Sequence, residues 1–104
     1  MQLDPRYRQK IRSLLDEKPQ RNIYKRFTIL TYQLGDVGKS MRYMDIYPEE
    51  RAAQLAYFKS AIADLMVQTI MMAELYKLDL EEILKLGIDR LDEYKLKSRY
   101  VEPE

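Results

Sequence analysis

The sequence predicts an all-α fold in which a long central helix is covered by three others. Apolar residues recur at alternating steps of three and four along most of the chain, the spacing of a helix face. Helix-start signals precede several of these stretches, at Asp4-Pro5, Pro48 and Asp79. No alternating strand pattern bounded by turn residues occurs. With 104 residues, the chain is expected to form a single domain, 1–104.

The first predicted helix begins at Pro5 and ends before Pro19. Asp4 provides an N-cap, and proline is favoured at the first helical position. Lys18 ends the helix because the residue before a proline is disfavoured in helical conformation. We expect residues 1–19 to form an N-terminal helical arm that packs on a partner subunit. Its apolar face contains Tyr7, Ile11, Leu14 and Leu15.

The second predicted helix runs from about Gln20 to Met44. Its apolar residues follow a 4-3 rhythm, which is typical of the seam of a coiled-coil-like pair. Gly35 and Gly38 lie inside it, each costing about 1 kcal/mol relative to alanine. These glycines indicate either a close approach of another helix or ligand, or a kink. The predicted seam contains Ile23, Phe27, Leu30, Leu34, Val37, Met41 and Met44.

The third and central helix is predicted from about Pro48 to Lys77, with Glu49 and Glu50 at the positive end of its dipole. It is apolar over most of its circumference and therefore needs cover on several sides. We expect the other helices and a second copy of the chain to supply this cover, as a homodimer or tetramer. One apolar row contains Leu55, Phe58, Ile62, Leu65, Thr69, Met72 and Tyr76, and a second contains Ala63, Met66, Ile70 and Ala73.

The last predicted helix opens at Asp79, where Asp79-Leu-Glu-Glu82 resembles a capping box. Gly87 is a candidate position for a bend or a break. Residues 98–104 are predicted to be a frayed tail. The residues expected to face inward are Leu80, Ile83, Leu84, Ile88 and Leu91.

The composition excludes several classes of function. A net charge of +1 argues against a nucleic-acid binder, which normally carries a basic patch or stripe. The longest apolar run is too short to span a membrane and is interrupted by Asp64 and Gln68. No secretory signal is visible, so a cytoplasmic location is expected. The abundance of Lys, Glu and Arg, with one Asn and no Cys, fits a thermophilic source.

The missing residue types also limit the chemistry. With no Cys and no His, the chain has no thiolate nucleophile, no imidazole base and no usual zinc site. Chemistry must use carboxylates, amides, hydroxyls, Lys or Arg. The cofactor that this inventory supports is a hard divalent cation, Mg²⁺ or Mn²⁺, held by oxygen ligands.

Two carboxylates off the apolar faces are the candidate metal ligands. Asp36 lies on a polar flank of the second helix, with Tyr32, Gln33, Ser40 and Tyr43, and Asp64 lies on a flank of the central helix. If the two helices pack antiparallel, the acids face each other near mid-length. Facing carboxylates in a helical bundle can hold a divalent metal.

The same stretches resemble the MazG-like nucleotide pyrophosphohydrolases. Tyr32-Gln33-Leu34-Gly35-Asp36 resembles the Glu-Glu-x-x-Glu motif of that family, and Ala61-Ile62-Ala63-Asp64 resembles its Glu-x-x-Asp motif. The apolar run with Asp79-Leu-Glu-Glu82 resembles the family's next passage. The resemblance covers about Phe27 to Tyr94. It implies an all-α oligomer that cleaves nucleoside triphosphates to monophosphate and pyrophosphate with Mg²⁺.

The resemblance also suggests roles for individual residues. Asp36, Asp64 and the Gln33 amide oxygen are the predicted metal ligands. Tyr32 is a candidate to stack on a nucleobase or to lie at a helix interface. Lys39 and Arg90 are candidates to contact phosphate or to be solvated charges.

Three of the family's acidic positions are replaced by Tyr32, Gln33 and Ala61, so we expect slow or absent hydrolysis. A single Mg²⁺ commonly uses one or two carboxylates with waters and substrate phosphates. The alternative function is a non-catalytic helical oligomer that senses nucleotides or binds other proteins.

Overall fold

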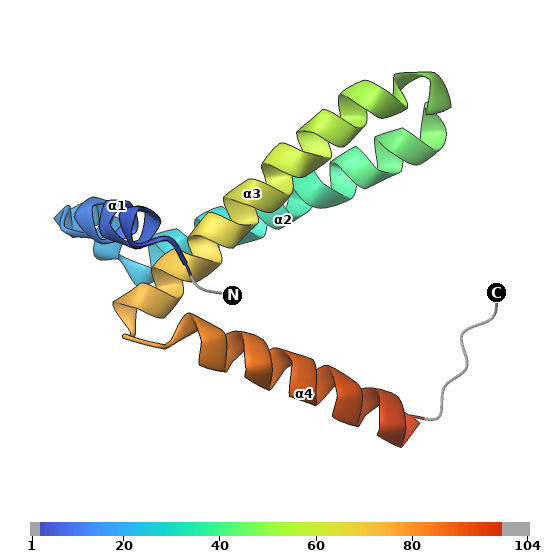
Figure 1. Cartoon of the computed structure of the whole chain (residues 1–104). Helices are drawn as coiled ribbons and strands as arrows, with labels where there is room; N and C mark the ends of the chain where they lie inside the picture. Colours follow the sequence, from blue (N-terminus) through green and yellow to red (C-terminus); the bar gives the residue numbers. More distant parts are fainter. Residues whose placement is uncertain (1–2, 99–104) are drawn as a thin grey trace.

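The computed structural model describes residues 3–98, and this part of the chain is helical with no strand (Figure 1). The α-helices are α1 (Pro5–Leu15), α2 (Ile23–Ile46), α3 (Arg51–Leu75) and α4 (Leu80–Ser98), and the short 3-10 helices η1 (Lys18–Arg21) and η2 (Pro48–Glu50) precede α2 and α3. The all-α prediction is therefore confirmed. Apart from Ser98, the predicted tail 98–104 lies outside the described residues.

The long helices α2 and α3 form an antiparallel hairpin, joined at Tyr47 and η2 (Figure 1). α1 lies across the end of the hairpin farthest from this connection, beside the last turns of α3. α4 leaves the end of α3 and diverges from the hairpin, so the four helices do not close into a bundle within one chain (Figure 1).

Side-chain caps fix where the helices begin. The Asp4 carboxylate accepts from the Arg6 backbone N–H at 2.9 Å, and Asp79 Oδ1 accepts from Glu81 N–H at 3.0 Å, as both predicted starts require. The Arg6 guanidinium and this backbone N–H also lower the pKa of Asp4. α2 begins later than the predicted start at about Gln20, because Asn22 caps it.

A small apolar core holds α1 onto the end of α3. It contains Ile11 and Leu15 from α1 with Ile70 and Met71 from α3, and Leu3, Leu75 and Leu80 pack at its edge. At the edge of this core, the Glu74 carboxylate forms ion pairs with two arginines of α1. Its Oε1 lies 3.3 Å from Arg8 Nε, and its Oε2 lies 3.1 Å from Arg12 Nε. The arm that we expected to pack on a partner subunit therefore packs on its own chain.

The predicted seam of α2 is only half used inside the chain. Val37 is buried and Ile23, Leu30 and Met44 are half-buried, whereas Phe27, Leu34 and Met41 are 60%, 60% and 55% exposed. These three seam residues therefore have no cover within the single chain. In place of these three residues, the polar residues that directly precede them in the sequence face α3. They are Arg26, Gln33 and Ser40.

The central helix is covered by α2 along one side and by α1 only at its last turns. Phe58, Leu65 and Met72 are half-buried and Ala61 and Gln68 are buried, so this side faces α2. Ile70 and Ala73 of the second predicted row are buried near α1. The other predicted residues are exposed in the single chain: Leu55, Ile62, Ala63, Met66, Thr69 and Tyr76.

α4 has no cover along most of its length. It runs unbroken through Gly87, and every residue from Glu81 to Lys95 is exposed. Within one chain, the prediction of an inward-facing side is therefore wrong for Ile83, Leu84, Ile88 and Leu91. The physical reason is the direction in which α4 leaves α3, because Leu80 alone among the described side chains of α4 reaches the core.

None of the described helices has a length and apolar character that would let it cross a membrane. α2 is likewise continuous through its two glycines, and a methyl group added at Gly35 or Gly38 would meet no atom of the chain within 4 Å. The helix therefore does not break at these positions, and no other helix of the described chain approaches them closely.

Candidate functional site

The candidate site is a cavity of about 350 Å³ on one side of the hairpin, between α2 and α3. Its size lies at the lower end of the range for small-molecule sites, about 300–1,000 Å³. Asp36 and Asp64, one from each helix, both line it. The other lining residues are Lys39, Ser40, Tyr43, Gln54, Tyr57, Ser60 and Ala61.

The two helices contribute residues at matching intervals. Asp36, Ser40 and Tyr43 of α2 follow one another at steps of four and three, so they share a helix face. Tyr57, Ala61 and Asp64 of α3 have the same spacing. Because the helices are antiparallel, this order places the two aspartates toward one end of the cavity and the two tyrosines toward the other.

Small residues at the middle of each face leave room for the cavity. Ser40 is 6% exposed and Ala61 is 5% exposed, so they form the contact between the helices at this level. Neither side chain is long enough to fill the space between the flanking aspartates and tyrosines. A larger residue at position 61 would overpack this contact and force the two helices apart.

The rim of the cavity carries two carboxylates and one ammonium. Lys39 Nζ lies 5.7 Å from the centre of the Tyr43 ring, within the range of a cation–π interaction. The Tyr43 ring in turn lies 5.9 Å from that of Tyr47, at an interplanar angle of 58°. The excess of negative charge favours a cation near the aspartates, and the aromatic end offers a surface for a planar group.

The structure separates the predicted site residues into two groups. Asp36, Asp64 and Lys39 line the cavity, whereas Gln33, Tyr32 and Arg90 do not. Gln33 is half-buried between α2 and α3, Tyr32 is 72% exposed, and Arg90 is exposed on α4. The roles proposed for all six residues stay predictions.

Two lining residues were missed by sequence reasoning. Gln54 and Ser60 lie one turn away from Tyr57 and Asp64, respectively, on the same flank of α3. Extending the flank by one helical turn in the sequence identifies both. They add an amide and a hydroxyl, both of which can donate to or accept from a ligand.

A row of buried polar groups continues along the hairpin beside the cavity. Gln33 Oε1 and Gln68 Oε1 are buried without a hydrogen-bond donor among the described residues, and Arg26 Nε is buried without an acceptor. Buried polar atoms normally have partners. The amide oxygen of Gln33 therefore retains the capacity to accept a bond, although it does not line the cavity.

The acids of the described residues form no group of three or more around a common point that could hold a metal. A cation at Asp36 and Asp64 would need further oxygen ligands from water or from a substrate, which is the usual situation for Mg²⁺. The two carboxylates fit this ligand set. They do not provide a closed metal site made by the protein alone.

Comparison with protein-family models, with curated proteins and with solved structures found no match for this chain.

Proposed function

We propose that the cavity between α2 and α3 binds a nucleoside triphosphate through one divalent cation, and that hydrolysis to monophosphate and pyrophosphate is slow or absent. The carrying observation is that Asp36 and Asp64, which lie far apart in the sequence, line one cavity. On this proposal the chain is a divergent relative of the MazG-like pyrophosphohydrolases, which the motif-like stretches containing both aspartates suggest.

The proposed cation reduces an electrostatic repulsion between the ligand and the site. The phosphates of the ligand and the two aspartates repel one another, and a divalent cation between them reduces this repulsion. Lys39 lines the same cavity, and its ammonium is assigned to phosphate oxygens that the cation does not contact. Tyr43 and Tyr57 offer rings near the other end, where a nucleobase would lie.

The residues present explain why slow chemistry is proposed. A metal ion polarises the phosphoryl oxygens, but attack by water also requires a base. Ala61 stands where the resemblance would place a carboxylate, and it is buried in the wall of the cavity. The remaining carboxylates are those assigned to the cation, so neither is free to accept the proton of water.

Binding is tested by thermal melting with Mg²⁺ or Mn²⁺ and a panel of ribo- and deoxynucleoside triphosphates. A ligand at ten times its Kd stabilises the folded state by about 1.4 kcal/mol, which moves the midpoint of a domain of this size by several degrees. We expect a shift that requires both metal and nucleotide. Asp36→Asn and Asp64→Asn should abolish it, while Asp45→Asn, an exposed aspartate of α2 outside the cavity, should retain it.

Pyrophosphate release under the same conditions measures the chemistry. If wild type and Asp64→Asn show the same shift, the proposed cation site is wrong, whatever the rate of release. If no triphosphate shifts the midpoint, the cavity is not a nucleotide site.

The second candidate is a non-catalytic helical module that binds other proteins, and the exposed apolar residues of the hairpin and α4 favour it. It predicts no response to metal or nucleotide, together with stable association through those apolar residues. The two candidates share a scaffold and are separated by the melting experiment above.

A further inference from the structure

Two apolar faces of the chain lie uncovered. The hairpin apolar face consists of Phe27, Leu34, Met41, Leu55, Ile62 and Met66, each at least 42% exposed. The α4 apolar face consists of Ile83, Leu84, Ile88 and Leu91, which are 37%, 46%, 53% and 68% exposed. A shallow groove of about 570 Å³ along α3 runs through part of the first face, beside Leu55 and Ile62.

The hairpin apolar face lies on the side opposite the candidate site. Leu34 and Asp36 are two residues apart and therefore about 200° apart around α2, and the same holds for Ile62 and Asp64 around α3. Since both aspartates line the cavity, both apolar residues point away from it. A partner on the hairpin apolar face would leave the cavity open.

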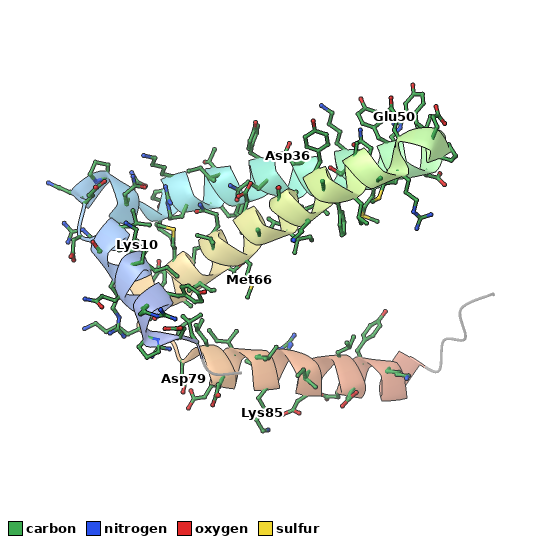
Figure 2. The ribbon with its side chains drawn as sticks, turned by 45° about the horizontal axis from the view of Figure 1, so that its top comes forward. Lys10, Asp36, Glu50, Met66, Asp79 and Lys85 are labelled. Atoms are coloured by element: carbon green, nitrogen blue, oxygen red, sulfur yellow. The ribbon has the colours of Figure 1, made fainter. Side chains whose placement is uncertain are left out.

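The two faces are turned toward the same space. Figure 2 shows Met66 pointing to the side of the hairpin on which α4 lies, and Lys85, on the polar side of α4, pointing away from the hairpin. The two faces nevertheless do not meet, because every residue from Glu81 to Lys95 is exposed.

The connection before α4 fixes its direction. Leu78 N–H donates to Ala73 C=O at 2.9 Å and Lys77 N–H to Glu74 C=O at 3.1 Å, with Lys77 at a φ of 55°. These are the bonds of a Schellman motif at the end of α3. Asp79 then caps α4. Folding α4 back onto its own hairpin would require this hydrogen-bonded turn to rearrange.

The surface area of the chain exceeds that expected of a folded monomer of the same mass. It is 9107 Å², whereas a folded monomer of 12.5 kDa is expected to expose about 6,200 Å². The difference is about 2,900 Å². Subtracting about 1,500 Å², the area that the eight residues outside 3–98 would expose in an extended chain, leaves about 1,400 Å² per chain. Two chains burying this area would form an interface of about 2,800 Å², the size of an obligate dimer.

We infer that a second copy of this chain covers both faces, with α4 of each chain packed on the hairpin apolar face of the other. Every copy carries both faces, so a two-fold arrangement buries both in one step. It also supports α4, since most of the stability of helices in proteins comes from the packing of an apolar face. The inference does not depend on the proposed nucleotide site.

The first test measures mass in solution by light scattering or sedimentation. Wild type is expected at twice 12.5 kDa at low micromolar concentration. Leu84→Glu should give the single-chain mass, while the matched control Leu86→Glu, two residues along on the opposite side of α4, should remain dimeric. Both leucines are exposed in the single chain, so neither substitution disturbs its core, and circular dichroism verifies the helix content. A monomeric wild type, or equal behaviour of the two variants, overturns the inference.

The second test identifies which faces meet. The chain has no Cys, so Met66→Cys and Ile88→Cys each introduce a single reactive site. A short bis-maleimide linker added to a mixture of the two variants should join them into a heterodimer. Linkage of Ile88→Cys chains only to each other would show that two α4 helices pair instead. In the double variant, linkage at single-chain mass in place of dimer mass would show that α4 folds back on its own hairpin, and either result overturns the inference.

Discussion

Replacing Arg26 by methionine is expected to stabilise the protein by about 1–3 kcal/mol, because this guanidinium is buried without a counter-charge. Arg26 is 4% exposed. Its Nη2 donates to Gln20 Oε1 at 2.9 Å and its Nη1 to Met71 Sδ at 3.5 Å, while Nε has no acceptor. Among the described residues no carboxylate forms an ion pair with it.

The magnitude follows from the contacts of the guanidinium. Burying an ion costs several kcal/mol even after relaxation, and a hydrogen bond to a charged group returns about 1.5–3 kcal/mol. The Gln20 amide supplies one such bond, whereas a thioether sulfur is a weak acceptor. Methionine keeps the apolar stem against Met71 and removes the charge. Gln20 is half-buried and can exchange its lost bond for water.

The assay is thermal and urea unfolding of Arg26→Met and wild type at equal protein concentration. Each kcal/mol should raise the midpoint by about 4–8 °C in a domain of this size. Arg42→Met is the control, an exposed arginine on the same helix, for which a change within about 0.5 kcal/mol is expected. A loss of stability by Arg26→Met would refute the reasoning. It would indicate that the guanidinium has an anionic partner outside the chain.

Four further substitutions test other parts of the fold by the same unfolding assay. Asn22→Ala should cost about 1 kcal/mol, since its Oδ1 accepts from two backbone N–H groups at the start of α2. Gly35→Ala should stabilise α2 by about 1 kcal/mol, because the added methyl meets no atom. Lys77→Gly should stabilise by about 0.5–1 kcal/mol, as relief of the left-handed φ outweighs the greater freedom of glycine in the unfolded chain. Met71→Ala should destabilise by about 2–5 kcal/mol, because Met71 is 3% exposed in the core.

Each of these substitutions has an outcome that contradicts its reasoning. An unchanged midpoint for Asn22→Ala would mean that α2 frays at its start. Destabilisation by Gly35→Ala would point to a ligand or partner against that backbone. A lower midpoint for Lys77→Gly would mean that the lysine side chain has a structural role. A small effect of Met71→Ala would mean that α1 is not held by the core described above.

The helices and their starts were predictable because they depend on local chemistry. Asp4-Pro5 and Asp79 act on residues within one turn, and both caps form as expected. The start of α2 was misplaced because Pro19 opens a short 3-10 helix before Asn22 caps α2. A proline alone does not distinguish these two kinds of helix.

The packing partners of the helices were not predictable in the same way. A periodic pattern shows that a face will be covered but not by which helix or which molecule. Leu34 and Leu84 both lie on correctly identified apolar faces, yet both are exposed in the single chain. The shared cavity of Asp36 and Asp64 followed from spacing and an antiparallel pair. Gln33, adjacent in the motif, turns instead into the contact between α2 and α3.

The polar contact between α2 and α3 has a consequence for how the protein responds to dilution. Arg26, Gln33 and Ser40 lie in the contact between the two helices, whereas Phe27, Leu34 and Met41 are exposed. Much of the apolar surface of the hairpin is therefore available for association with another molecule. A fold completed by such an encounter gains stability by mass action. Its melting temperature should therefore rise with each tenfold increase in protein concentration, and dilution should lower it.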